Sequence, residues 1–219
     1  MITALQTLTM LSAPRSMPIV CTAPSMPCAL VPIAPGSEEL EATAIVNVLR
    51  RAGWSVTLAS VGVPGMDPVS CARNQLLVPD AAIEAPGILD SDYDAILLPG
   101  GMPGASNLAA SSPLLERLRR QAAEKKWYGA ICAAPAVVFA GAAADLLPQQ
   151  ATCHPAFIEK LEAAGCDANR FLDRVVVDDD RGCVTSRGPG TAIEFALKVV
   201  ELVQGSEVAE ATGGPMVLP

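Results

Sequence analysis

Short apolar runs alternate along the chain with longer segments in which apolar residues recur at helical spacing. The runs that predict buried strands are CALVPI at 28–33, WSVTLAS at 54–60, YDAILL at 93–98 and WYGAI at 127–131. Between the first two, Leu40, Ala44 and Val48 fall on one face of a helix. Strands that alternate with helices indicate a mostly parallel central sheet with helices on both faces. The pattern therefore predicts an α/β fold.

End signals support the predicted helices. In the segment 37–53, Ser37 is a candidate N-cap, acidic residues fill the first turn, arginines occupy the last turn, and Gly53 follows. Further helices are predicted at 112–126, 133–143, 155–165 and 191–205. The segment 174–186 predicts a hairpin with residues 178–182 in its turn.

The first 27 residues differ in character from the rest. No acidic residue precedes Glu38, and Arg15 is the only charged residue in that stretch. We expect an N-terminal extension at 1–27, either a transit peptide or a disordered tail, followed by a single domain at 28–219. The first alternative places the protein in a chloroplast or mitochondrion, and the second in the cytoplasm.

Composition and charge exclude several classes of function. The net charge of −8 and the pI near 4.6 argue against nucleic-acid binding through a basic face. The seven cysteines are scattered without a CxxC pair, which favours a reducing, intracellular compartment. The single histidine, His154, excludes a multi-histidine metal site, so no metal and no other cofactor are expected. No apolar run of about 18 residues predicts a membrane span.

Cys132 lies between a predicted strand and a predicted helix of small residues. This layout is typical of a nucleophile elbow, in which a sharp turn exposes the reactive side chain. The amides at the start of the helix are expected to favour the thiolate and to lower the pKa of the thiol. The alternative is a buried cysteine that serves as a small apolar side chain.

Glu41 lies at the start of the first predicted helix. We expect that start to lie at the same edge of the sheet as Cys132, where strands end and helices begin. Beside a thiolate, Glu41 would share one proton with the sulfur and act as general acid and base in turn. Alternatively, it only complements the helix dipole.

Two more sites lie near the predicted strand ends. Gly100 and Gly101 allow close approach of the backbone, and with the amide of Ala133 they could form an oxyanion hole; a plain turn is the alternative. His154 precedes Pro155 and is expected to cap a helix. It is also the only histidine that could assist Cys132.

The motifs GSEELEA, DAILLPGGMPGA, AICAAP, CHP and TSRGPGTAIEFAL occur in this order. With them the chain resembles the ThiJ/PfpI superfamily, and most closely the branch of the Parkinson's-associated protein deglycase, or DJ-one. The resemblance runs from about Cys28 to the C-terminus. It implies a flavodoxin-like sandwich with a cysteine nucleophile elbow, and a homodimer. It also implies a role for each candidate residue: Cys132 as oxidisable nucleophile, Glu41 as its protonated partner, His154 as a nearby polar group, and Gly101 and Ala133 as oxyanion-hole amides.

The activity that this resemblance implies is a cofactor-independent glyoxalase III, a lyase of the D-lactate dehydratase type. Cys132 would attack methylglyoxal or glyoxal to give a hemithioacetal, and Glu41 or His154 would move the proton that leads to lactate or glycolate. Deglycation would use related chemistry. The alternative is a redox-sensing chaperone of oxidative stress in which Cys132 is oxidised to a sulfinic acid. One departure from the family is Met102, which follows the glycine pair where a polar residue is familiar.

Overall fold

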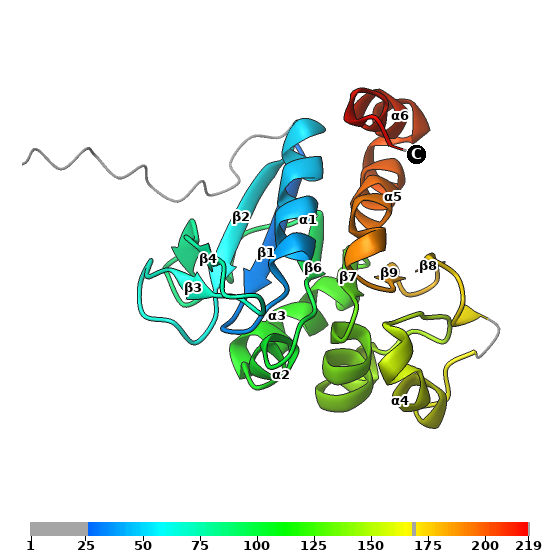
Figure 1. Ribbon diagram of the computed structural model, residues 1–219, viewed down its shortest axis with the longest axis horizontal. Helices are drawn as coiled ribbons and strands as arrows, with labels where there is room; N and C mark the ends of the chain where they lie inside the picture. Colours follow the sequence, from blue (N-terminus) through cyan, green and yellow to red (C-terminus); the bar gives the residue numbers. More distant parts are fainter. Residues whose placement is uncertain (1–25, 168–169, 219) are drawn as a thin grey trace, which may run out of the picture.

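The computed structural model describes residues 26–167 and 170–218, and a seven-stranded sheet forms its centre (Figure 1). The strands lie in the order β5-β2-β1-β6-β7-β9-β8. Their bounds are Cys28–Ile33 for β1, Ser55–Ser60 for β2, Ala81–Ala82 for β5, Ala95–Leu98 for β6, Trp127–Ile131 for β7, Val175–Asp178 for β8 and Cys183–Ser186 for β9. All neighbours are parallel except β8 and β9, which form the predicted hairpin. The predicted fold class is therefore confirmed.

Helices cover both faces of this sheet. On one face, α1 (Glu39–Arg51) packs beside α5 (Ala192–Gln204), and α6 (Ser206–Gly213) packs on α5 (Figure 1). On the other face lie α2 (Gly104–Ala109), α3 (Ser112–Ala123) and the π-helix η1 (Pro135–Ala142). Because both faces are covered, all six residues of β1 are buried; Cys28 and Leu30 pack into the apolar core on one face, and Ala29 and Val31 into the core on the other.

Several predicted elements differ in detail from the structure. The N-cap of α1 is Glu38, whose carboxylate accepts the Glu41 N–H at 2.7 Å, while Ser37 Oγ accepts the Ala34 N–H at 3.0 Å instead. The predicted helix at 155–165 is a 3₁₀ turn, η3 (Pro155–Phe157), followed by α4 (Ile158–Ala163). The stretch at 69–77 forms a small hairpin of β3 (Val69–Ser70) and β4 (Leu76–Leu77).

The N-terminal extension lies outside the described residues up to position 25. No helix in the described part of the chain is both long and apolar enough to cross a bilayer. The loops that follow β1, β6 and β7 meet at one edge of the sheet, because these three strands are parallel neighbours. This edge is where ligands bind in open α/β sheets, and it holds the candidate site.

Candidate active site

Cys132 directly follows β7 in a strained backbone conformation. Its φ is +63°, a left-handed value that side chains other than glycine rarely adopt. Both of its polar backbone groups are held: its N–H donates to the Ser186 carbonyl at 3.0 Å, and its carbonyl accepts the His154 N–H at 2.9 Å. The residue is 8% exposed. The predicted elbow is therefore present, and the helix predicted after it is a π-helix, η1.

Glu41 reaches the elbow from the first turn of α1 and is fully buried. Its Oε2 accepts the Gly100 N–H at 2.7 Å. Its Oε1 is buried and makes no ordinary hydrogen bond to any described residue, which leaves this oxygen to interact with the Cys132 thiol. One carboxyl group therefore links the glycine loop to the nucleophile.

Burial controls the ionisation of this pair. It raises the pKa of Glu41 from the usual 4.5 to about 7, against the opposing hydrogen bonds from the Gly100 N–H and Cys132. It also raises the pKa of Cys132 to about 12, and ionised Glu41 adds to the rise. The amides of Gly101 and Ala133 act in the opposite direction but are outweighed. The expected lowering of the thiol pKa is therefore wrong, and between these two values the pair carries one proton.

The two glycines have separate functions. The Gly100 N–H is bonded to Glu41, so it is not the oxyanion donor that the sequence allowed. The amides that approach the Cys132 sulfur belong to Gly101 and Ala133. Gly101 has a φ of +86°, and a Cβ there would lie 2.5 Å from the Glu38 nitrogen. Only glycine allows this loop to place its amide at the sulfur.

His154 meets the elbow through its backbone. Its imidazole Nδ1 accepts the Ala156 N–H at 3.2 Å and so caps the 3₁₀ turn η3, as expected. Because Nδ1 is occupied, only Nε2 remains for proton transfer. In the described ranges 26–167 and 170–218, no three His, Cys, Asp or Glu side chains gather as ligands for a metal ion.

Ser186 and Thr191 lie in the motif TSRGPGTAIEFAL and were not predicted as site residues. In the structure, the Ser186 carbonyl holds the Cys132 N–H, and its hydroxyl contacts that of Thr191 at 2.7 Å. Ser186 is the last residue of β9, and Thr191 ends the 3₁₀ turn η5 (Pro189–Thr191) that directly precedes α5. The alignment of β7 with β9 brings them to the elbow, and no local pattern signals it.

Replacing Gly100 with alanine is expected to distort the elbow. The added Cβ would lie 2.6 Å from the Cys132 Cβ and 2.8 Å from the Ala133 nitrogen, so backbone must move. We expect a loss of about 1–3 kcal/mol in the free energy of unfolding, measured by urea denaturation. Gly190→Ala is the matched control, because a Cβ there meets nothing within 4 Å. Equal stability of the two variants would contradict this packing.

Comparison with known proteins gives concordant results. The model of the DJ-1/PfpI family matches residues 28–202. A Danio rerio protein named Parkinson disease protein 7 homolog is 40% identical over 190 residues, which cover 87% of this chain and 96% of that protein. A Caenorhabditis elegans protein named glutathione-independent glyoxalase DJR-1.2 is 37% identical, over 83% of this chain and 91% of that protein. The structure of oxidized Toxoplasma gondii DJ-1 is 37% identical, with a TM-score of 0.77 over 87% of this chain and 97% of that one.

Proposed function

Because the chain belongs to the DJ-1/PfpI family, we propose that it is a glutathione-independent glyoxalase that converts methylglyoxal to lactate and glyoxal to glycolate. The observation that carries the proposal is the buried Cys132–Glu41 pair beside the amides of Gly101 and Ala133. The name of the Caenorhabditis elegans relative supports it. The reaction needs a nucleophile, a proton carrier and an oxyanion site, and these groups can supply all three.

The first step joins the thiol to the aldehyde carbon. As the Cys132 sulfur attacks, the thiol proton passes to the Glu41 carboxylate, which is ionised above a pKa of about 7. The aldehyde oxygen gains negative charge and is stabilised by the N–H groups of Gly101 and Ala133. Protonation of that oxygen by Glu41 then gives a neutral hemithioacetal and returns the carboxylate.

The second step moves a proton between adjacent carbons. A base removes the hydrogen from the carbon bonded to sulfur, and the electron pair forms an enediol with the neighbouring carbonyl. Return of the proton to that neighbouring carbon gives a thioester, which water hydrolyses to lactate and free thiol. Glu41 is the base that the geometry favours, because its carboxyl group already lies at the sulfur, whereas His154 has only Nε2 available. The net reaction adds one water and requires no redox partner.

Turnover of small dicarbonyls tests this proposal. The purified protein, free of glutathione and treated with a chelator, should consume many equivalents of methylglyoxal per chain. The loss of the absorbance of the dicarbonyl measures this consumption. Release of lactate in step with consumption would support a lyase of the D-lactate dehydratase type. Consumption that stops at one equivalent per thiol would contradict catalysis and indicate simple adduct formation. Parallel assays on glycated thiols and amines would show whether the site also deglycates.

The pH dependence of kcat/KM should report the shared proton. The pair carries two protons below about pH 7 and one proton above it, and only the singly protonated pair has a proton acceptor for the attacking thiol. We therefore expect kcat/KM to rise with pH through a midpoint near 7 and then to level off. Measurement of initial rates from pH 5 to pH 9 checks this, and a profile that falls over this range would contradict the assignment of the base.

The alternative proposal is a redox sensor with chaperone activity. It is favoured by the same carboxyl group, because neutral Glu41 could donate a hydrogen bond to an oxidised Cys132. Two equivalents of peroxide would convert the thiol to a sulfinic acid and release two waters. Intact mass after peroxide titration would detect the gain of two oxygen atoms. A protein that gains them readily but turns over no dicarbonyl would be a sensor.

We also propose that two copies of the chain form a homodimer. Leu40 of α1 is 57% exposed, and Leu76 and Val78 at the β3–β4 hairpin are 62% and 64% exposed. Leu77, which lies between the last two, lines a hollow of about 300 Å³ together with residues of α1. Exposed apolar side chains on two elements that border a common hollow are typical of a protein interface. Light scattering in solution measures the mass directly, and a monomer at micromolar concentration would contradict the proposal.

A further inference from the structure

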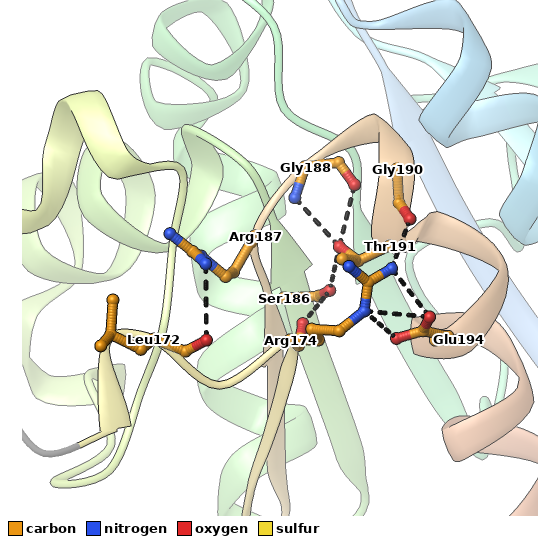
Figure 2. A network of polar contacts seen from close by, with 8 residues as sticks. All are labelled: Leu172, Arg174, Ser186, Arg187, Gly188, Gly190, Thr191 and Glu194. Atoms are coloured by element: carbon orange, nitrogen blue, oxygen red, sulfur yellow. Dashed lines mark hydrogen bonds and ion pairs between the residues drawn. The ribbon is translucent and has the colours of Figure 1, made fainter.

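A chain of polar contacts through two hydroxyl groups runs from the loop after β9 to the segment before β8 (Figure 2). The Gly188 N–H lies 3.1 Å from Thr191 Oγ1, which lies 2.7 Å from Ser186 Oγ, which in turn lies 2.7 Å from the Arg174 carbonyl oxygen. Ser186 is fully buried and Thr191 is 5% exposed. We propose that Thr191 and Ser186 are positioning residues that hold the Cys132 elbow in its reactive geometry. This inference rests on the proposed function for its kinetic consequence.

Two hydroxyl protons serve three oxygen–oxygen contacts in this chain. Thr191 Oγ1 lies 2.9 Å from the Gly188 carbonyl oxygen in addition to its contact with Ser186, and Ser186 contacts the Arg174 carbonyl oxygen. When Thr191 donates to Ser186 and Ser186 donates to the Arg174 carbonyl, both of the shortest contacts become hydrogen bonds. The Gly188 N–H then donates to Thr191, and every link of the chain points the same way.

This chain is joined to both backbone groups of Cys132. The carbonyl of Ser186 accepts the Cys132 N–H at 3.0 Å, and the N–H of His154 donates to the Cys132 carbonyl at 2.9 Å. Gly188 packs against His154, because a Cβ at Gly188 would lie 3.5 Å from the imidazole Cδ2. The hydroxyl of Thr191 therefore restrains Ser186, which bonds the Cys132 N–H directly. It also restrains Gly188, which packs against His154, the residue that bonds the Cys132 carbonyl.

The strained backbone of Cys132 makes these restraints consequential. A residue at a φ of +63° keeps that conformation only when its surroundings over-determine it. Loss of the Thr191 hydroxyl would leave a buried hydroxyl and a buried N–H with fewer partners, and the loop would move to satisfy them. The thiol would then shift relative to the amides of Gly101 and Ala133. Such a shift impairs attack more than it impairs binding of the substrate.

The test compares three variants in two assays. Thr191→Val removes the hydroxyl and keeps the shape, while Thr191→Ser keeps the hydroxyl. Thr212→Val is the matched control, because the Thr212 hydroxyl bonds the Val208 carbonyl at 2.7 Å in the remote helix α6. The first assay is the rate of alkylation of Cys132 by iodoacetamide, read by peptide mass. The second is kcat and KM for methylglyoxal.

We expect Thr191→Val to lower the alkylation rate and kcat by about 10- to 100-fold with little change in KM. Thr191→Ser should restore most of both rates, and Thr212→Val should leave them unchanged. The inference is overturned if Thr191→Val stays within about twofold of the wild type in alkylation, or if Thr191→Ser falls as far as Thr191→Val. If Thr191→Val does not fold, Ser186→Ala removes the next link and is judged against Thr212→Val in the same way.

The alkylation assay separates this inference from the proposed function. A wild type that turns over no dicarbonyl contradicts the glyoxalase, yet a slower alkylation of Cys132 in Thr191→Val would still support the positioning role. Active wild type with equal alkylation in both Thr191 variants contradicts the positioning role alone.

Discussion

Replacement of Cys132 with alanine is expected to reduce the turnover of methylglyoxal by at least about a thousandfold. The amides of Gly101 and Ala133 and the carboxyl group of Glu41 would remain, but no atom could form the bond to the aldehyde carbon. The substitution keeps the Cβ and shortens the side chain by one atom, so the fold should be retained. Steady-state kinetics with circular dichroism of the same samples measure both quantities.

Cys166→Ala is the matched control for this variant. Both cysteines are 8% exposed, and Cys166 lies in the separate apolar cluster beside α4, where its sulfur contacts the Pro148 carbonyl. This control should keep its turnover. A Cys132→Ala protein that still released lactate at more than a few per cent of the wild-type rate would exclude the thiol as nucleophile.

Replacement of Glu41 with glutamine is expected to stabilise the fold above pH 7 while it reduces turnover by about 100- to 10,000-fold. The pKa of Glu41 is raised from 4.5 to about 7 in the folded protein, so folding favours the protonated form. That contribution is complete below about pH 4.5 and is lost as the pH rises through 7. Above pH 7 the buried carboxylate costs on the order of 3 kcal/mol, and a neutral amide avoids that cost.

Thermal unfolding of both proteins at pH 5 and pH 8 measures this effect. The variant should unfold roughly 5–10 °C higher than the wild type at pH 8, and the difference should shrink at pH 5. Glu39→Gln is the control, because both oxygens of Glu39 already accept the Arg73 N–H, at 2.9 and 3.1 Å. An equal or lower unfolding temperature for Glu41→Gln at pH 8 would show that the carboxylate is not buried at a cost.

The periodicity of apolar residues predicted the main elements well. The strand expected at 28–33 is β1 (Cys28–Ile33), and the helix expected at 191–205 is α5 (Ala192–Gln204). Elements with weak periodicity were not predicted. One is β5, which has only two residues. The other is α2, which contains glycine and serine and is stabilised by burial of Ala105 and Leu108. Tertiary packing overrides local preference in such short segments. The family resemblance drawn from the motifs is confirmed.

The candidate site was predictable in its residues but not in its electrostatics. The strand–cysteine–helix order located Cys132, and the helix start located Glu41. The same pattern predicted a lowered thiol pKa, because the dipole of a following helix is visible in a sequence while the depth of burial is not. The bond from the Gly100 N–H to Glu41 joins the loop after β6 to α1, and the position of Ser186 beside Cys132 depends on the pairing of β7 with β9. Neither leaves a local signal.

The balance between methylglyoxal consumed and lactate released tests the central claim most directly. Thiols and amines of any protein remove the aldehyde slowly as adducts, so only the product distinguishes a glyoxalase from a scavenger. Proton NMR of glutathione-free reactions with the wild type and with Cys132→Ser measures both species together. A glyoxalase that uses Cys132 would give one lactate per methylglyoxal from the wild type and none from the variant. Consumption without lactate, or equal lactate from both proteins, would contradict it.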